Sequence, residues 1–200
     1  GVTPTQYRNQ PEWLVSVLQK PLLMGVSGFS KAGECILPEL TFSGSVYSFQ
    51  DSFLPSGPEG HSVLKNVVVS VGKENKGKTG VAVKINPDES QAIGRNGILN
   101  VEMIVQSVGE EESDVSIVIP AGKYIQFRFT GSWDEHLVFS RLAYFCLAEE
   151  NIARRNSFDL VYFSVPEDAA DDIRCQHYIP VTDSDKRPPE TTQPPKSSNG

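Results

Sequence analysis

Apolar and polar residues alternate most regularly between Val115 and Gly131, in two segments that Pro120-Ala121-Gly122 separates. The alternating apolar residues are Ile117 and Ile119 in the first segment, and Ile125, Phe127 and Phe129 in the second. A period of two is typical of a strand with one buried face, and proline with glycine favours a break between strands. The sequence therefore predicts a hairpin of two strands joined by a tight turn.

A helix start follows this hairpin directly. Ser132 precedes Glu135 by three residues, the spacing of a capping box, in which a hydroxyl and a carboxylate bond the first free amides of a helix. We therefore expect a helix from 132 to about 150, with His136 on its solvated side. The residues expected on its apolar face are Trp133, Leu137, Leu142, Phe145 and Cys146.

The rest of the chain has weaker patterns. Strands are predicted at 13–18, 22–26, 67–71, 80–85, 98–105, 158–165 and 174–181. The apolar spacing between Leu37 and Phe53 predicts a helix at 38–53, and the prolines and glycines of 54–61 predict a loop. We expect residues 1–11 to form a flexible arm and residues 182–200, which are rich in proline and contain no apolar residue, to form a disordered tail.

The predicted elements occur twice in the order strand, helix, strand, strand. This order suggests an internal duplication within residues 12–181, with one module at about 12–107 and a second at about 108–181. The fold class expected is α+β: two pseudo-symmetric modules that form a curved antiparallel sheet with helices on one face.

Composition excludes several classes of protein. The 200 residues carry 18 basic and 25 acidic side chains, a formal charge of -7, so direct binding of nucleic acid by this chain is not expected. No apolar run approaches the ~20 residues that span a bilayer, and no signal peptide is recognisable. We expect a cytoplasmic protein that does not insert into membranes.

The cysteines and histidines do not form a recognisable metal or catalytic motif. Cys35, Cys146 and Cys175 are widely separated and fit neither a disulfide framework nor a zinc site, so they are expected to be small buried apolar residues. No serine or cysteine lies in a nucleophile motif with a histidine, and the glycines form no phosphate-binding loop. We therefore expect no metal and no cofactor.

Five separated sequence pieces together resemble the GyrI-like domain, the effector-binding domain of AraC-type and MerR-type regulators. The pieces are Ile119-Pro120-Ala121-Gly122-Lys123-Tyr124 with Phe127 and Gly131, the capped helix, Phe158-Asp159, Pro166-Glu167, and Tyr178-Ile179-Pro180-Val181. The resemblance covers about 115–181. It implies a curved sheet under a pair of helices, with a groove that binds hydrophobic and often cationic molecules, and a subset of the family is described as hydrolases of strained electrophilic compounds.

The resemblance also implies a site. The family has a buried glutamate in a Phe-Glu-x-Tyr pattern, and Asp159 and Val161 stand here at the glutamate and tyrosine positions. An unpaired carboxylate in an apolar groove must be protonated, pair with a cation or contact water, so Asp159 is a candidate counter-ion for a lipophilic cation. The residues expected to bind ligand with it are Trp133, Leu137, Val161 and Phe163. The alternative is that Asp159 lies exposed at a sheet edge or pairs with Arg154, Arg155 or Arg174, and that Trp133 is ordinary core.

Three functions follow. The first is a sensing or sequestering domain for a hydrophobic small molecule, either neutral or cationic. The second is a hydrolase in which Asp159 activates water or attacks a strained carbon; it needs a second polar group, which Val161 does not provide. The third is a protein-interaction module. No helix-turn-helix is recognisable, so in a transcription regulator a DNA-binding domain or a partner protein outside this sequence would contact DNA.

Overall fold

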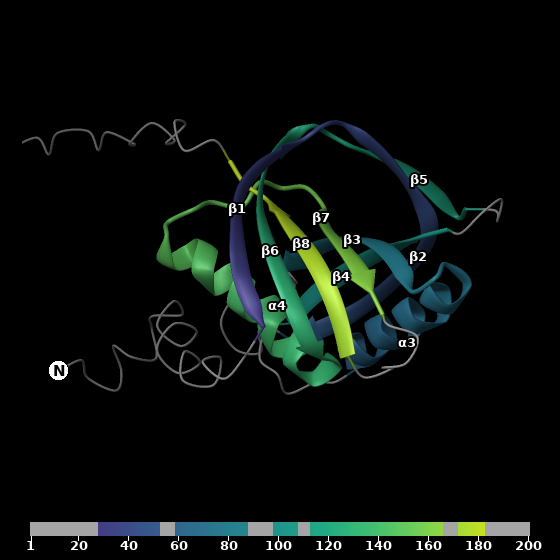
Figure 1. The fold of residues 1–200 in the computed structure, drawn as a ribbon. Coiled ribbons are helices and arrows are strands. Elements are labelled where there is room, and N and C mark those ends of the chain that lie inside the picture. The colour runs from purple at the N-terminus through teal and green to yellow at the C-terminus, as the bar shows by residue number, and fades with distance from the viewer. Residues whose placement is uncertain (1–27, 53–58, 88–97, 108–112, 166–171, 183–200) are drawn as a thin grey trace, which may run out of the picture.

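The computed structural model describes residues 28–52, 59–87, 98–107, 113–165 and 172–182, and the account below concerns these residues. Their elements, labelled as in Figure 1, are β1 (Phe29–Leu37), β2 (Leu40–Ser52), α3 (Glu59–Glu74), β3 (Lys78–Pro87), β4 (Ile98–Gln106), β5 (Val115–Ile119), β6 (Gly122–Ser132), α4 (Trp133–Glu149), β7 (Asp159–Ser164) and β8 (Asp172–Pro180). Neither of these two helices has the length and hydropathy that crossing a membrane would require.

The strands form one eight-stranded sheet in the order β1-β6-β8-β7-β3-β4-β2-β5, and neighbouring strands are antiparallel. The sheet is strongly curved, and α3 and α4 lie side by side below it (Figure 1). This arrangement confirms the predicted α+β fold with a curved antiparallel sheet. Predicted strands at 80–85, 98–105, 158–165 and 174–181 are confirmed as β3, β4, β7 and β8.

The strand order has the symmetry of a duplicated module. Exchanging β1, β2, β3 and β4 for β5, β6, β7 and β8 reverses the order and leaves it otherwise unchanged. The central pair is β3 with β7, where Val81 lies opposite Val161. Each module therefore supplies half of the sheet and one helix.

The predicted hairpin at 115–131 is wrong, although both of its strands exist. β5 pairs with β2, whereas β6 pairs with β1 and β8. The extended chain continues through Pro120 instead of reversing, and it lies beside the equivalent passage at Pro38: Leu37 is opposite Gly122, and Leu40 is opposite Ile119. A tight reversal favours residues with a left-handed backbone, and Gly122 has no positive φ. The result is the two-stranded arch that spans the top of Figure 1.

The capped helix is confirmed as α4. The Ser132 hydroxyl accepts from the Glu135 amide at 3.3 Å, and the Glu135 carboxylate accepts from the Ser132 amide at 2.9 Å. The predicted face was wrong for most of its residues, because the buried residues of α4 are Trp133, His136, Phe139, Ala143 and Leu147. Of the residues predicted, Trp133 is buried and Cys146 is half-buried against the core. His136 is only 4% exposed and not on the solvated side. α4 is apolar over much of its circumference, so periodicity did not identify the buried side.

The first module contains two wrong assignments. Residues predicted as a helix at 38–53 form β2, and α3 includes both the predicted strand at 67–71 and the end of the predicted loop at 54–61. A run of valines favours a strand by local preference. However, Leu64, Val67, Val68 and Val71 also have helical spacing, and they pack as one stripe into the core. β1 was not predicted, and the predictions for 1–11, 13–18, 22–26 and 183–200 lie outside the described residues.

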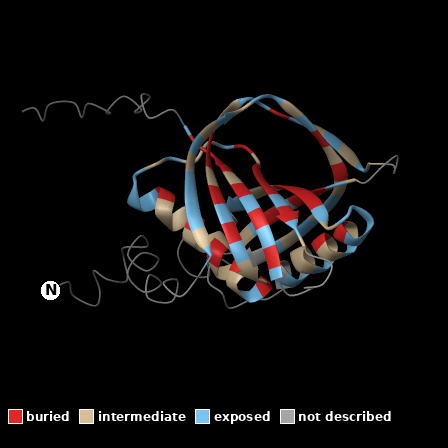
Figure 2. Cartoon of the chain, viewed as in Figure 1, coloured by how far each residue is buried: buried red, intermediate tan, exposed pale blue. Residues whose placement is uncertain are grey.

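The main core lies between the helices and the sheet. Its largest side chains are aromatic, and Phe129 stacks on Phe139 with ring centroids 4.9 Å apart. Buried residues alternate with exposed ones along β8, as Figure 2 shows in red and blue, whereas residues 79–82 of β3 and 159–161 of β7 are buried without interruption. A second apolar cluster on the other face, around Phe42, Ile104 and Leu160, fills the space under the arch. Both faces of the central sheet are therefore covered.

Candidate functional site

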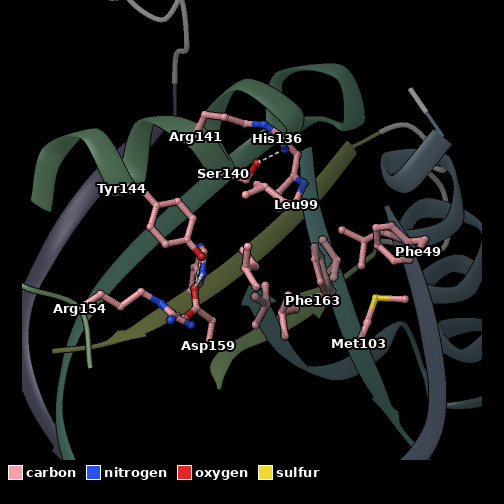
Figure 3. Close-up of a pocket in the computed structure, with 16 residues that line it drawn as sticks. Phe49, Leu99, Met103, His136, Ser140, Arg141, Tyr144, Arg154, Asp159 and Phe163 are labelled. Atoms are coloured by element: carbon pink, nitrogen blue, oxygen red, sulfur yellow. Dashed lines mark hydrogen bonds and ion pairs between the residues drawn. The ribbon is translucent and has the colours of Figure 1, made fainter. Parts of the chain in front are cut away.

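A cavity of about 340 Å³ lies between α4, α3 and the sheet. Its apolar lining residues are Phe49, Leu64, Val83, Ile85, Leu99, Val101, Met103, Val161 and Phe163. Its polar lining residues are His136, Ser140, Arg141, Tyr144, Arg154, Asp159 and His177. Figure 3 shows Tyr144, Arg154 and Asp159 together at one end and Phe49, Met103 and Phe163 toward the other, while His136, Ser140 and Arg141 lie along α4 beside Leu99. The cavity is therefore amphipathic.

Asp159, the first residue of β7, is the centre of the polar end and is completely buried. Arg154 donates to its Oδ1 atom from Nε at 3.1 Å and from Nη2 at 2.7 Å. Its Oδ2 atom accepts from His177 Nε2 at 3.0 Å and from the Tyr144 hydroxyl. Arg154 is itself held by the Ser157 carbonyl, which accepts from Nη2 at 2.8 Å. Four donors therefore satisfy one buried carboxylate.

The environment keeps Asp159 ionised. Burial alone would raise the pKa of Asp159, but the hydrogen bond and charge of His177, followed by Arg154 and Tyr144, outweigh it and hold the pKa below its usual value. Burial also lowers the pKa of Arg154, but the adjacent carboxylate raises it more. Burial, and then Asp159, raise the pKa of Tyr144 well above its usual value. The group is thus a buried ion pair with a neutral phenol donor.

β7 brings three of the five predicted site residues to the cavity. Asp159, Val161 and Phe163 point to one face of the strand and line the cavity, as the two-residue period requires. Tyr162, next to Val161, faces away and is 38% exposed. Trp133 is outside the cavity lining and stacks against Phe163 with centroids 5.6 Å apart.

Leu137 is half-buried on α4 and is not among the cavity-lining residues. Of the three arginines considered as partners of Asp159, Arg154 is the one that pairs with it. Arg155 donates to the Ala121 carbonyl at 3.0 Å and lies over the Tyr124 ring, while Arg174 is exposed on β8.

The sequence reasoning missed one side of the site, which α4 provides. His136, Ser140 and Tyr144 are four residues apart, with Arg141 beside them, and all four line the cavity. Polar residues at this spacing form a stripe along a helix, so a polar stripe on an otherwise apolar helix was a signal available in the sequence. Ser140 donates to the Leu137 carbonyl at 2.8 Å and accepts from Arg141 Nη1. Its proton is directed at backbone instead of a histidine, so it is not an activated nucleophile.

His177 was the other missed residue. In β8, the alternating buried positions are Ile173, Cys175, His177 and Ile179, and their neighbours are exposed or half-buried except for Pro180 at the end of the strand, which is buried. A histidine at a position where the alternation predicts a buried apolar residue was therefore a signal of a polar site available in the sequence. Among the cysteines, Cys175 is buried as expected, whereas Cys35 and Cys146 are only half-buried. Across the part of the chain that the structure describes, no three His, Cys, Asp or Glu side chains are grouped as metal ligands.

Comparison with known proteins identifies similar folds and no similar sequence. No protein-family model and no curated protein sequence matches the chain. The structure of SAV2435 bound to tetraphenylphosphonium matches with a TM-score of 0.50 and 10% identity, over 78% of this chain and 94% of SAV2435. An integron cassette protein of Vibrio cholerae matches with a TM-score of 0.49 and 15% identity, over 78% of this chain and all of that one. The match to SAV2435 concerns the fold alone, and it agrees with the fold that the resemblance of the sequence motifs implies.

Proposed function

We propose that this chain is a small-molecule-binding domain, and that its ligand occupies the cavity between α4 and the sheet. The observation that carries the proposal is an amphipathic cavity of about 340 Å³ with a satisfied ion pair at one end. Ligand sites are typically concave and mostly apolar, with a few fixed polar groups that orient the ligand. The structure of SAV2435, a protein of similar fold, contains bound tetraphenylphosphonium. This supports a small-molecule-binding role for the same fold here.

Val161 and Phe163 form part of the apolar wall against which the ligand packs. Trp133 supports Phe163 from behind by stacking. Burying the apolar part of a ligand against this wall contributes roughly 25 cal/mol for each Å² removed from water. The affinity therefore depends mainly on the apolar body of the ligand.

Asp159 organises the polar end in this proposal and does not serve as the counter-ion of a cationic ligand. A cation that bound the carboxylate directly would have to displace Arg154, and breaking a buried ion pair costs about 3–5 kcal/mol. The same four hydrogen bonds make Asp159 a poor nucleophile, since both oxygens already accept hydrogen bonds from donors of the protein. Binding is thus favoured over hydrolysis of strained compounds.

Ligand binding would serve either to sense the molecule or to sequester it. In a sensor, a DNA-binding domain or partner protein would read the ligand-bound state, because the net charge of -7 disfavours contact of this chain with DNA. Ligand binding stabilises the folded state by about 2.7 kcal/mol when the ligand is at 100 times its dissociation constant. If the ligand binds one folded conformation more tightly than another, the difference in binding free energy shifts the equilibrium toward the conformation that binds it more tightly.

The test uses the neutral fluorophore N-phenyl-1-naphthylamine, whose emission rises in apolar surroundings. Leu64 lines the cavity from α3, so Leu64→Trp should fill it and abolish the fluorescence increase. Leu142→Trp is the matched control, because Leu142 is also half-buried on a helix but does not line the cavity. Thermal unfolding of both variants establishes that they fold. Equal probe binding by the two folded variants would contradict the proposal.

A further inference from the structure

The polar end of the cavity contains a histidine with one ring nitrogen that no protein group bonds. His177, in β8, lines the cavity and is only 5% exposed. Its Nε2 atom lies 3.0 Å from Asp159 Oδ2, and within the described part of the chain no other hydrogen bond involves the ring. The Nδ1 atom is nevertheless not fully enclosed by protein atoms. Because the space beside this buried residue is the cavity that it lines, Nδ1 is open toward the cavity.

This open nitrogen is a hydrogen-bond acceptor. Asp159 is ionised, so the Nε2 atom beside it carries a proton and donates to the carboxylate. A neutral imidazole has one protonated nitrogen and one acceptor nitrogen, which leaves a lone pair on Nδ1. A second proton on the ring would add a positive charge to a buried site in which Arg154 already balances Asp159, and an uncompensated buried charge is unfavourable.

The imidazole of His177 is held in a fixed orientation. Its ring meets the rings of Phe139 and Tyr144 edge to face, with centroids 6.2 and 6.1 Å away, and the bond to Asp159 fixes its third side. A group that is already ordered loses little entropy when it binds a ligand. Val161 lies directly opposite His177 in the sheet and also lines the cavity, so the apolar wall begins beside the acceptor.

The cavity offers no free carboxylate to a cationic donor. Asp159 is the carboxylate among the lining residues, and Arg154, Tyr144 and His177 direct four hydrogen bonds at its two oxygens. An ammonium group would therefore lose its hydration without gaining a counter-ion. An uncharged O–H or N–H group loses less on leaving water, and one hydrogen bond to Nδ1 replaces the bond that it gives up.

We infer that the ligand carries an uncharged hydroxyl or N–H group that donates to Nδ1 of His177, with its apolar body against β2, β3 and β4. This inference rests on the proposed function and specifies the chemical class of the ligand. Asp159 is a positioning residue in this arrangement, because it sets which ring nitrogen carries the proton and leaves the other as the acceptor.

The experiment compares two isomers, 1-octanol and 1-methoxyheptane, which have the same atoms but differ in having and lacking a donor. Each is titrated against bound N-phenyl-1-naphthylamine at about pH 8, where an imidazole of ordinary pKa is neutral. We expect octanol to bind about fivefold more tightly than the ether, the advantage of one neutral hydrogen bond. Octylammonium, a charged donor of the same length, should bind more weakly than octanol.

The variant His177→Gln removes the acceptor and keeps the donor. The glutamine amide can still donate to Asp159, but it has no acceptor atom at the position of Nδ1. The preference for octanol over the ether should disappear, while the ether binds as it does to the parent. Gln176→Ala is the control, because Gln176 is exposed on the same strand and does not line the cavity. This control should keep the fivefold preference.

A second measurement uses the parent protein, so it does not depend on the folding of a variant. Nitrogen NMR of protein labelled with ¹⁵N-histidine shows which ring nitrogen carries the proton, and the spectrum of His177→Gln identifies the resonances of His177. We expect a proton on Nε2 and none on Nδ1. The Nδ1 resonance should move when octanol is added and stay in place when the ether is added.

The outcomes separate this inference from the proposed function. If the ether binds as tightly as octanol, or octylammonium binds more tightly than octanol, the ligand class is wrong and the cavity remains a ligand site. Equal losses of octanol and ether binding in His177→Gln, or a proton on Nδ1 in the parent, would overturn the role of His177. If neither the fluorophore nor any of the three compounds binds, the inference and the proposed function are both refuted.

Discussion

Replacing Asp159 by asparagine tests the buried ion pair most directly. The asparagine side chain has nearly the same shape, but it offers one acceptor oxygen where the carboxylate offers two, and four donors point at this position. The amide nitrogen, itself a donor, would face other donors. Arg154, with 25% of its side chain exposed, would keep a partly buried charge without its counter-ion.

The expected loss in the free energy of unfolding is about 3 kcal/mol, the lower end of the cost of breaking a buried pair, because Arg154 retains some contact with water. For a protein of 150–250 residues, each kcal/mol lowers the melting temperature by about 2–4 °C. The variant should therefore melt about 6–12 °C below the parent. Urea unfolding monitored by circular dichroism gives the free energy, and a thermal scan gives the melting temperature.

The control is Asp172→Asn, because Asp172 is exposed at the start of β8. Its effect should lie within about 0.5 kcal/mol of zero. A double-mutant cycle with Arg154→Met then isolates the interaction of Asp159 with Arg154. Arg154→Met should lower the free energy of unfolding less in the Asp159→Asn variant than in the parent, and the difference, which is the coupling energy, should be about 1.5 kcal/mol or more. Additive effects, or a loss for Asp159→Asn no larger than for Asp172→Asn, would refute the ion pair as a stabilising element.

Two further predictions concern pH and backbone packing. The pKa of Asp159 is lower in the folded protein than its usual value. Its contribution to stability is therefore present above the usual value of about 3.9 and is lost as pH falls through the lower, folded pKa. Urea unfolding at several pH values should show the parent and Asp159→Asn converging only below about pH 4, and convergence near neutral pH would contradict the lowered pKa. Gly44→Ala should destabilise the fold by about 3 kcal/mol or more, because its new Cβ would lie 1.8 Å from the Val105 carbonyl oxygen. Gly122→Ala should destabilise it less, because the new Cβ would lie 2.4 Å from the end of the Arg155 side chain, which can move. Equal melting temperatures for the two glycine variants would contradict this difference.

Two features of the second module were predictable because their signals are local. The capping box at Ser132 and the two-residue period from Asp159 to Phe163 depend on neighbouring residues only, and both appear in the structure as predicted. The same period placed Asp159, Val161 and Phe163 on one face before their surroundings were known. What it did not show was the partner of Asp159, since Tyr144 and His177 reach it from other elements.

The errors have non-local causes. Pro120 marks a break in the alternation, but the sequence near it does not show whether the chain reverses there. That depends on the chain segment at Pro38, which is about eighty residues earlier in the sequence and lies beside Pro120 in the arch. In α3, the valine run from Val67 to Val71 has the local preference of a strand, and burial of one helical stripe against the sheet overrides it. Tertiary packing decided both cases, and a single sequence does not display it.

A difference between equivalent positions of the pseudo-symmetric sheet accounts for the polar end of the cavity. In the central strand pair, Val81 lies opposite Val161, and the residues two positions before them are Thr79 and Asp159. Each is a buried polar residue that bonds to the helix of its own module: Thr79 donates to the Val68 carbonyl of α3 at 3.2 Å, and Asp159 accepts from Tyr144 of α4. The hydroxyl of Thr79 is satisfied by backbone and requires no further partner, whereas the charge of Asp159 requires Arg154 and His177.

This difference at equivalent positions breaks the symmetry of the cavity. A cavity with the same residues from both modules would accept a ligand equally well in two orientations related by the pseudo-symmetry. Here the second module supplies the arginines and the first module supplies the apolar wall of β2, β3 and β4, so an amphipathic ligand has one favoured orientation. Because the charge of Asp159 is buried and already paired with Arg154, we place this ion pair in the framework of the site.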